Sequence, residues 1–258
     1  MISTKHIGQV LRGLAVVAAP VSVAHAGSFA VNPVRVTLSA TQAVAAVTVQ
    51  NVGSEPTVVQ LETSTWTQHD GADVLAPTSE VLATPPILTI QPGTSRVIRV
   101  GLRRAPDARQ ELTYRLFLRE VPPPEPISQG LRVALLVSMP IFVVPPRLPA
   151  PDVHWRALRT QDGKIRVQAT NTGASHIQLG QLEVALAADG AKISTRNMSE
   201  YVLPDNSREW TVDAKSLPPA GALLSISDQA DTGKVRSEVK LEDDAGESKP
   251  TAPATASR

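Results

Sequence analysis

Short runs of alternating apolar and polar residues, separated by turn-forming residues, make up most of the chain. Successive side chains of a β-strand point to opposite faces, so this alternation is typical of strands with one buried face. No stretch has the period and length of an ordinary helix. The pattern predicts an all-β protein, with strands expected at residues 31–49, 57–66, 96–102, 112–121, 131–144, 153–158, 165–170, 181–187, 210–212, 223–227 and 234–241.

Turn residues separate these runs at the spacing expected of a β-sandwich. Asp-Gly pairs stand at 70–71, 162–163 and 189–190. Between strand-like runs such a pair indicates a hairpin turn before it indicates a calcium site or a glycosidase carboxylate. Asn-x-Gly sequences at 51–53 and 171–173 are further turns. Short strands with turns at this spacing predict sandwich domains.

Prolines divide the chain into two parts. Residues 145–151 contain four prolines, which favours a stiff connector between domains. A cysteine-free chain must hold each domain by burial alone, and an immunoglobulin-like sandwich takes about 100 residues. We therefore expect two immunoglobulin-like β-sandwich domains arranged at an angle, residues 27–146 and 153–245, joined by a linker at 147–152 and followed by a disordered tail at 246–258.

The first residues have the layout of a secretory signal peptide. Lys5 and Arg12 precede an apolar stretch at residues 14–23, and the small-residue sequence Ala-His-Ala follows at 24–26. This pattern predicts cleavage after residue 26 and an exported protein. The alternative is an anchor that stays in the membrane. The apolar stretch is too short for a spanning helix, and no later stretch reaches the roughly 20 residues needed.

Charge and aromatic content exclude a nucleic-acid binder. The chain has 25 lysines and arginines against 24 aspartates and glutamates, and loss of the signal peptide with Lys5 and Arg12 would change the net charge from +1 to −1. Aromatic residues are only 3% of the chain. A nucleic-acid surface needs clustered cations with stacking aromatics, which this composition does not supply.

The residues of common catalytic and metal sites do not occur at the required spacing. The histidines of the mature chain, His69, His154 and His176, lie far apart in the sequence. No nucleophile elbow, zinc-protease helix, phosphate-binding loop or dinucleotide fingerprint is present. We expect no catalytic residue, no metal and no cofactor, and a protein that works by binding another polypeptide.

Four sequence segments carry a resemblance to a known family. Together they resemble the PapD-like periplasmic chaperones of the chaperone/usher pilus assembly pathway, over about residues 29 to 241. The segment Ser-Met-Pro-Ile-Phe at 138–142 resembles the archaic branch of that family more than the best-studied pilus chaperones. The four segments are Asn-Pro-Val-Arg-Val at 32–36, Ala-Thr-Pro-Pro at 83–86 followed by Gln-Pro-Gly at 91–93, Tyr-Arg-Leu-Phe-Leu-Arg-Glu-Val-Pro at 114–122, and the apolar strand from residue 131.

The resemblance implies a periplasmic chaperone of pilus or fimbrial subunits. Such a chaperone completes the subunit's sandwich with a donated strand and passes it to an outer-membrane usher. The implied donor residues are Leu131, Val133, Leu135 and Val137. Periodicity alone favours an interior strand here, although Pro140 fits a sheet edge better. Unbound, the same strand would allow self-association.

Two basic side chains in the cleft between the domains hold the client's C-terminal carboxylate in members of this family. Arg35 matches the first, and a guanidinium suits the role because it binds a carboxylate with paired donors. The second, a lysine, falls on Pro140 here. Arg99 is the first substitute, and Arg96 and Arg115 are weaker ones.

The family's ion-pair network between domains is only partly kept. Glu120 and Asp231 match its acidic members, whereas its arginine falls on Val144.

Two other functions stay open from the residues alone. A structural subunit of a surface fibre would resemble one incomplete sandwich with an N-terminal extension. An extracellular adhesion or carbohydrate-binding protein would need an aromatic-lined groove, whereas the tryptophans are isolated at strand positions.

Overall fold

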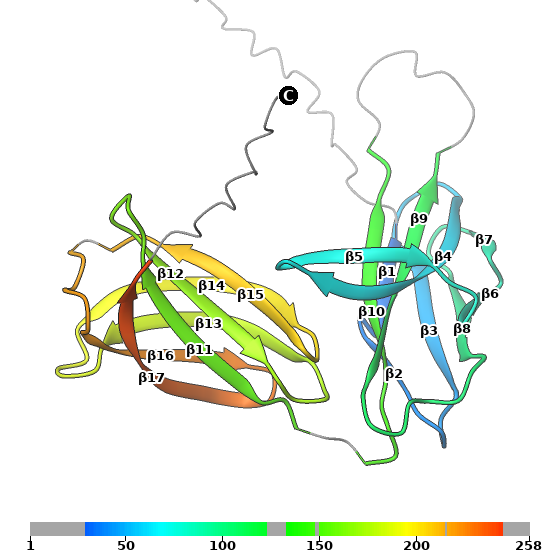
Figure 1. The fold of residues 1–258 in the computed structure, drawn as a ribbon. Helices are drawn as coiled ribbons and strands as arrows, with labels where there is room; N and C mark the ends of the chain where they lie inside the picture. The colour runs from blue at the N-terminus through cyan, green and yellow to red at the C-terminus, as the bar shows by residue number, and fades with distance from the viewer. Residues whose placement is uncertain (1–28, 123–132, 148–149, 215, 245–258) are drawn as a thin grey trace, which may run out of the picture.

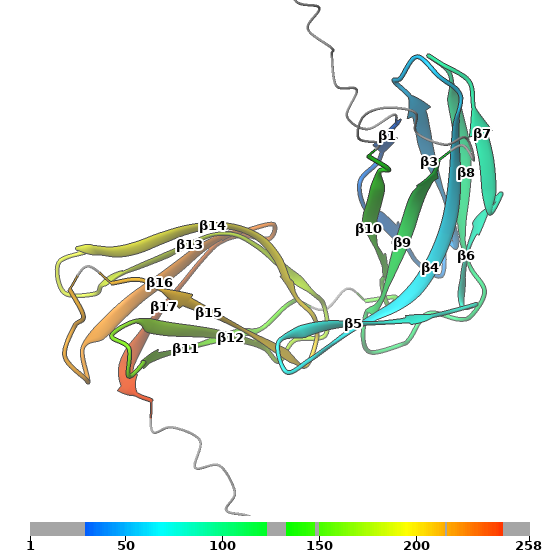
Figure 2. The same cartoon turned by 90° about the horizontal axis from the view of Figure 1, so that it is seen from above.

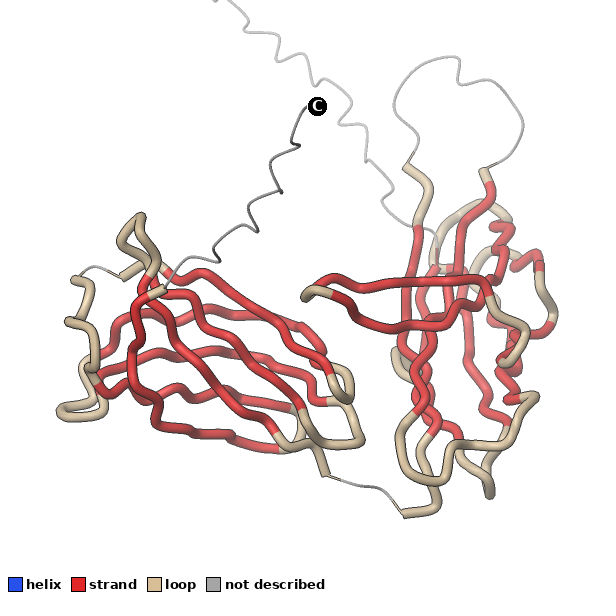
Figure 3. The backbone as a smooth tube through the Cα atoms, viewed as in Figure 1, coloured by secondary structure: helices blue, strands red, loops and turns tan. Residues whose placement is uncertain are grey.

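The computed structural model describes most of the chain as β-strands and connecting loops, and Figure 3 shows no helix within that part. The expected signal peptide and tail and the donor residue Leu131 lie outside the described residues. The described part also contains no apolar helix of membrane-spanning length. The described ranges are 29–122, 133–147, 150–214 and 216–244.

The N-terminal domain is a sandwich of two sheets that share one core. One sheet has four strands in the order β1-β3-β8-β6, and the other has six, in the order β2-β10-β9-β4-β5 with β7 beside β4. Alternate residues point inward, as Tyr114, Leu116 and Leu118 do in β9. The strands are β1 (Phe29–Asn32), β2 (Val36–Leu38), β3 (Val44–Asn51), β4 (Thr57–His69), β5 (Ala72–Pro77), β6 (Val81–Thr84), β7 (Ile87–Ile90), β8 (Ser95–Leu102), β9 (Leu112–Val121) and β10 (Leu136–Val143).

The C-terminal domain is built from seven strands around a second core. They form one continuous path, β14-β13-β16-β17-β11-β12-β15, in which the short parallel pairing of β11 with β17 joins two halves that face each other. Trp155 and Trp210 are buried in this core. The strands are β11 (Val153–Arg159), β12 (Ile165–Asn171), β13 (Ile177–Leu186), β14 (Lys192–Val202), β15 (Asn206–Val212), β16 (Leu223–Ala230) and β17 (Gly233–Asp243).

The two sandwiches lie at an angle to each other and are joined near one end. In Figures 1 and 2 the hairpin of β4 and β5 extends from the N-terminal domain toward the C-terminal domain. Its two-residue turn is Asp70-Gly71, and both residues have positive φ, as a type I′ hairpin requires. The all-β, two-sandwich fold expected from the sequence is therefore the fold observed.

Four strands, β5, β6, β7 and β14, were absent from the sequence prediction, and β10 begins later than expected. All residues of β5 are exposed, and β14 is mostly exposed or half-buried. Neither strand therefore carries the apolar alternation that a half-buried strand shows. β10 begins at Leu136 rather than at residue 131. β10 begins where its residues start to pair with β9, and the sequence pattern does not show where that pairing starts.

Candidate functional site

One side of β10 is open over most of the strand. β9 pairs with β10 along its whole length, from Leu136 to Val143. On the other side β2 pairs only with the last three residues, beginning with Val36 opposite Ile141. Within the described ranges, no strand pairs with that side of residues 133–140. We call residues 133–140 the open edge.

Hydrogen-bond directions show which main-chain groups the open edge presents. The Glu120 N–H donates to the Leu135 carbonyl at 2.9 Å, so Leu135 faces β9. Because this direction alternates along an antiparallel strand, Leu136 and Ser138 turn their N–H and C=O groups to the open side. Pro140 faces the same way and presents only a carbonyl, so its ring interrupts no bond to β9.

The side chains of the open edge are apolar and only partly covered. Leu135 and Val137 pack against the core of the N-terminal domain but are not fully buried. Val133 and Leu136 are 61% and 47% exposed. Exposed apolar side chains beside unpaired main-chain groups are a template for another strand. The open edge can thus add a strand and cover its side chains at once.

Arg35 stands where the open edge ends. β1 pairs with β3 in the four-stranded sheet and β2 pairs with β10 in the six-stranded sheet, so the chain changes sheets between them. Arg35 is the last residue of this crossing, one position before Val36, and continuing the register places it beside Pro140. Its Nη1 lies 3.1 Å from Oδ2 of Asp231, in the turn between β16 and β17.

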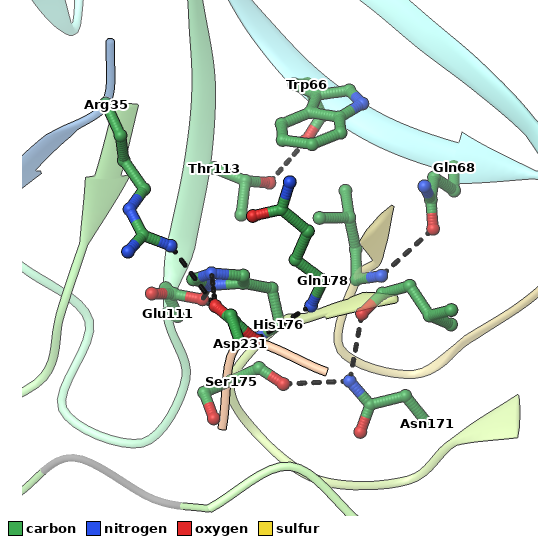
Figure 4. A network of polar contacts seen from close by, with 12 residues as sticks. Arg35, Trp66, Gln68, Glu111, Thr113, Asn171, Ser175, His176, Gln178 and Asp231 are labelled. Atoms are coloured by element: carbon green, nitrogen blue, oxygen red, sulfur yellow. Dashed lines mark hydrogen bonds and ion pairs between the residues drawn. The ribbon is translucent and has the colours of Figure 1, made fainter. Parts of the chain in front are cut away.

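A polar cluster at the domain junction surrounds this ion pair (Figure 4). His176 Nδ1 lies 2.6 Å from Oε2 of the buried Glu111, and His176 Nε2 lies 3.8 Å from Oδ2 of Asp231. The imidazole stacks on the Phe142 ring at 3.5 Å between centroids. These residues line a pocket of about 480 Å³ together with Arg35. Charged groups from both domains are thus held within one small site.

Aromatic rings adjoin this polar cluster, since both Phe142 and Tyr201 contact the His176 ring. Trp66 and Phe142 of the N-terminal domain form a buried cluster with Leu203, and Tyr201 packs against it edge-on to Trp66. The Arg115 guanidinium lies over the Trp66 ring, 3.7 Å from its centroid. Burial lowers the pKa of Arg115, which the nearby Asp73 carboxylate partly offsets. This cation is therefore held in a partly desolvated place.

The β4–β5 hairpin fixes the C-terminal domain through main-chain contacts. Gln68 donates to the Tyr201 carbonyl at 2.9 Å and accepts from the Leu203 N–H at 3.0 Å. Asp73 pairs with Arg208 of β15. A buried amide that satisfies two backbone groups across a domain boundary restrains their spacing. The hairpin therefore acts as an arm that holds the cleft geometry.

Several residues predicted for the site lie elsewhere. Arg99 and Arg96 are exposed residues of β8, in the four-stranded sheet, whereas Arg35 and β10 belong to the face of the six-stranded sheet. Arg99 cannot share a site with Arg35, because the sandwich core separates the two outer faces. The choice of Arg99 as substitute anchor was wrong.

The interdomain assignment of Glu120 is also corrected. Its Oε2 accepts from the Leu135 N–H at 3.0 Å, at the end of β9 that lies away from the C-terminal domain in Figure 1. Glu111, just before the other end of β9, contacts that domain instead. Along a strand of this length the two ends are about 30 Å apart at roughly 3.3 Å per residue. No local sequence pattern distinguished Glu111, whose partner His176 is distant in the chain.

Comparison with known proteins gives one family match and two sequence relatives. Residues 28–149 match the model described as "Pili and flagellar-assembly chaperone, PapD N-terminal domain". The uncharacterized fimbrial chaperone YcbF of Escherichia coli K12 is 27% identical over 158 residues, which is 60% of this chain and 62% of YcbF. The chaperone protein PapD of Escherichia coli is 27% identical over 96 residues, 35% of this chain and 39% of PapD.

Solved structures show the same two-domain fold. A chain in the CsuC–CsuE chaperone–tip adhesion subunit pre-assembly complex, from the archaic chaperone-usher Csu pili of Acinetobacter baumannii, matches with a TM-score of 0.61 at 20% identity, covering 84% of this chain and 99% of that one. The CupB2 chaperone of Pseudomonas aeruginosa matches with a TM-score of 0.54 at 17% identity, covering 81% and 98%. At these sequence identities the similarity shows a shared fold and nothing further.

Proposed function

We propose that this chain is a periplasmic chaperone of pilus or fimbrial subunits, because its residues 28–149 match the family model of the pili and flagellar-assembly chaperones. It binds a subunit through the open edge, donates a strand to complete the subunit's fold, and delivers it to an outer-membrane usher. The observation that carries the proposal is the strand β10, paired on one side and open along residues 133–140 on the other.

The open edge fits a client that lacks a strand. Leu136 and Ser138 offer main-chain donors and acceptors to a new strand, which would extend the six-stranded sheet by one position. Leu135 and Val137 pack partly against the domain's own core, Val133 is exposed just before them, and all three would be covered by the client's own apolar side chains. Burying an exposed Val or Leu stabilises by about 1.5–3 kcal/mol, so this edge supplies substantial binding energy. Leu131, outside the described residues, extends the proposed donor set.

The client's chain end is proposed to bind at Arg35. This guanidinium stands at the closed end of the open edge, where a strand running along β10 would finish. A terminal carboxylate there would meet paired N–H donors, and it would exchange with the Asp231 carboxylate that Arg35 binds in the structure. Delivery to the usher replaces one donated strand by another, so the scheme needs no ATP and no cofactor.

The test changes the open edge without changing the fold. Ser138→Pro removes an N–H that faces the open side, whereas Val137→Pro removes one that faces β9. We expect Ser138→Pro to keep the melting temperature within a few degrees and to abolish co-purification of a pilus subunit co-expressed from the same gene cluster. Val137→Pro should lower stability by about 1–3 kcal/mol, because it removes a ladder bond to β9 and leaves its acceptor without a donor.

Ser138→Ala is the control, because it removes the side chain and keeps the N–H. It should co-purify with the subunit as the unchanged protein does. If the subunit stays bound to the folded Ser138→Pro variant, strand donation at this edge is wrong. If no subunit binds the unchanged protein, the chaperone function itself is wrong.

A further inference from the structure

The carboxyl group of Asp228 is buried inside the C-terminal sandwich. Asp228 lies on the inward face of β16 and is 2% exposed. Its Oδ1 accepts a hydrogen bond from the Gly180 N–H at 3.0 Å, while its Oδ2 is buried and has no hydrogen-bond partner among the described residues. A buried carboxyl group with an unpaired oxygen costs folding free energy, so its position requires a physical reason.

Asp228 stands opposite a β-bulge in β13. Leu179 pairs with Ala230 and Leu182 pairs with Asp228, so three steps along β13 match two steps along β16. The extra residue keeps both Leu179 and Leu182 buried, although their odd spacing would otherwise put them on opposite faces of the sheet. The bulge therefore lets β13 bury its apolar side chains on both sides of this point.

Asp228 and Gly180 together hold the bulge. A bulge disrupts the ladder locally, and here the Gly180 N–H donates to the Asp228 carboxyl group. A Cβ on Gly180 would lie 2.5 Å from the carbonyl oxygen of Gln229, so only glycine lets the two strands approach this closely. The side-chain acceptor and the missing Cβ are both needed for this local geometry.

The bulge lies next to the residues that bind Arg35. The Asp231 N–H donates to the Gln178 carbonyl at 3.0 Å, and the Gln178 N–H donates to Oδ1 of Asp231 at 3.1 Å. The other oxygen of this carboxylate, Oδ2, accepts from Arg35 at 3.1 Å (Figure 4). The Asp231 carboxylate is therefore oriented by a main-chain group only two residues from Gly180.

The protonation state of Asp228 decides how firmly it holds the bulge. Burial raises the pKa of Asp228 above its ordinary value of 3.8, and the N–H groups of Gly180 and Gln181 partly offset this. A carboxylate accepts such bonds more strongly than a neutral carboxyl group does, because charge assistance strengthens a hydrogen bond. Uptake of a proton from solvent therefore weakens the contact with Gly180.

Charged residues on the strands around Asp228 are directed elsewhere. Glu183 of β13 and Arg236 of β17 alternate with inward-facing residues and lie on the outer face. Arg208 of β15 is held by carboxylates of β5 and β14. His176 lies against the ion pair at the junction, 3.8 Å from its carboxylate. Burial and main-chain N–H groups therefore govern the proton on Asp228.

We propose that Asp228 is a positioning residue for the Arg35–Asp231 ion pair, and that its carboxylate acts through the bulge of β13. The charged form holds Gly180 and keeps Gln178 and Asp231 where Arg35 is bound. The protonated form loosens the bulge and weakens this contact between the domains. The inference needs no client. Where the proposed chaperone function holds, it makes the availability of Arg35 depend on pH.

Backbone amide NMR tests whether the bulge transmits this protonation. The shifts of the Gly180 and Gln178 amides are followed in the full chain from about pH 7.5 to about pH 3.5. Both should change with one shared midpoint, above the ordinary aspartate pKa. Asp228→Asn should remove this step from both amides, because an amide side chain takes up no proton. A separate step from the neighbouring His176 is told apart because Asp228→Asn leaves it in place.

Two controls separate transmission from general effects. In Asp231→Asn the Gly180 amide should keep its midpoint, since Asp228 is unchanged. Asp189→Asn, in an exposed turn of the same domain, should alter neither titration. The inference is overturned if Gln178 does not share the Gly180 midpoint, or if Gln178 keeps that step in Asp228→Asn. Should Asp228→Asn fail to fold, the two midpoints of the unchanged protein decide the question alone.

Discussion

At the scale of single residues, two buried asparagines organise equivalent turns in the two domains. Asn51 donates to the Glu55 and Ile90 carbonyls and accepts from the Gly53 N–H. Asn171 likewise donates to the Ser175 and Val202 carbonyls and accepts from the Gly173 N–H. Both side chains are fully buried. Each amide therefore satisfies loop groups that would otherwise be buried without partners.

A tyrosine–carboxylate contact in the N-terminal domain gives a pH-dependent prediction. Tyr114 donates to Glu80 at 2.6 Å, and this hydrogen bond, more than the nearby Arg104, lowers the pKa of Glu80 below its ordinary value of 4.5. A lowered folded-state pKa adds stability above the unfolded-state pKa, and that stability is lost as the pH falls through the folded-state value.

We therefore expect Tyr114→Phe to lower the free energy of unfolding by about 1 kcal/mol at neutral pH, a small value because Glu80 is partly exposed. The difference should shrink below about pH 4, where Glu80 becomes protonated in both proteins. Denaturant unfolding at several pH values measures it. Glu80→Gln should remove the same pH dependence. A Tyr114→Phe difference that stays constant from neutral pH to pH 3 would contradict the assignment.

At the scale of elements, the linker is held by the turn that follows β12. The Thr172 N–H donates to the Asp152 carbonyl at 2.8 Å, and the Asp152 N–H donates to Oδ1 of Asn171 at 3.2 Å. A Cβ on Gly173 would lie 2.4 Å from the Asp152 nitrogen. Only glycine lets the linker backbone pass this closely, so the Asn-x-Gly sequence here positions the connection between domains.

Gly173→Ala should therefore displace the linker and destabilise the C-terminal domain by about 1–3 kcal/mol, because the neighbouring atoms are backbone and cannot move aside cheaply. Thermal unfolding measures the change. Gly101→Ala in β8 is the control: its added Cβ would make an ordinary 3.7 Å contact with Val44, and its stability should change little. Equal effects of the two substitutions would show that close packing at Gly173 is not the cause.

At the scale of the whole molecule, the cleft is assembled from both domains. Arg35, Trp66 and Arg115 come from the N-terminal sandwich, while Tyr201 and Asp231 come from the C-terminal one. The β4–β5 arm, the Glu111–His176 contact and the aromatic cluster hold the domains at one spacing. The Arg35–Asp231 contact across the boundary therefore depends on the angle between the domains.

The arm should couple the two domains during unfolding. Gln68→Ala with Arg208→Ala removes its contacts with the C-terminal domain and leaves the Leu203 N–H without its acceptor, a loss of about 1–3 kcal/mol. We expect calorimetry to resolve two separate transitions in this variant where the unchanged protein shows one. Gln60→Ala, at the other end of β4, should leave the single transition. A single transition in the double variant would mean that the arm does not couple the domains.

The sequence by itself determined the features that depend on near neighbours. Apolar alternation identified most core strands, since burial of one face repeats every second residue. Asp-Gly pairs located hairpins, because positive φ is a local requirement. Pro140 pointed to an edge, since a missing N–H is a property of the residue itself. Strand β14 was not predicted, because it is an edge strand with polar residues on both faces and therefore lacks apolar alternation.

Only the tertiary structure decided which charges meet. Arg35 and Asp231 are 196 positions apart, and Glu111 and His176 are 65 apart, so the local pattern of apolar and polar residues cannot predict either contact. Arg115 and Arg99 are both arginines of alternating strands, but register places one beside Pro140 and the other on the opposite sheet. Pairing of strands distant in sequence fixes where each side chain stands, and that pairing separates Arg99 from Arg35.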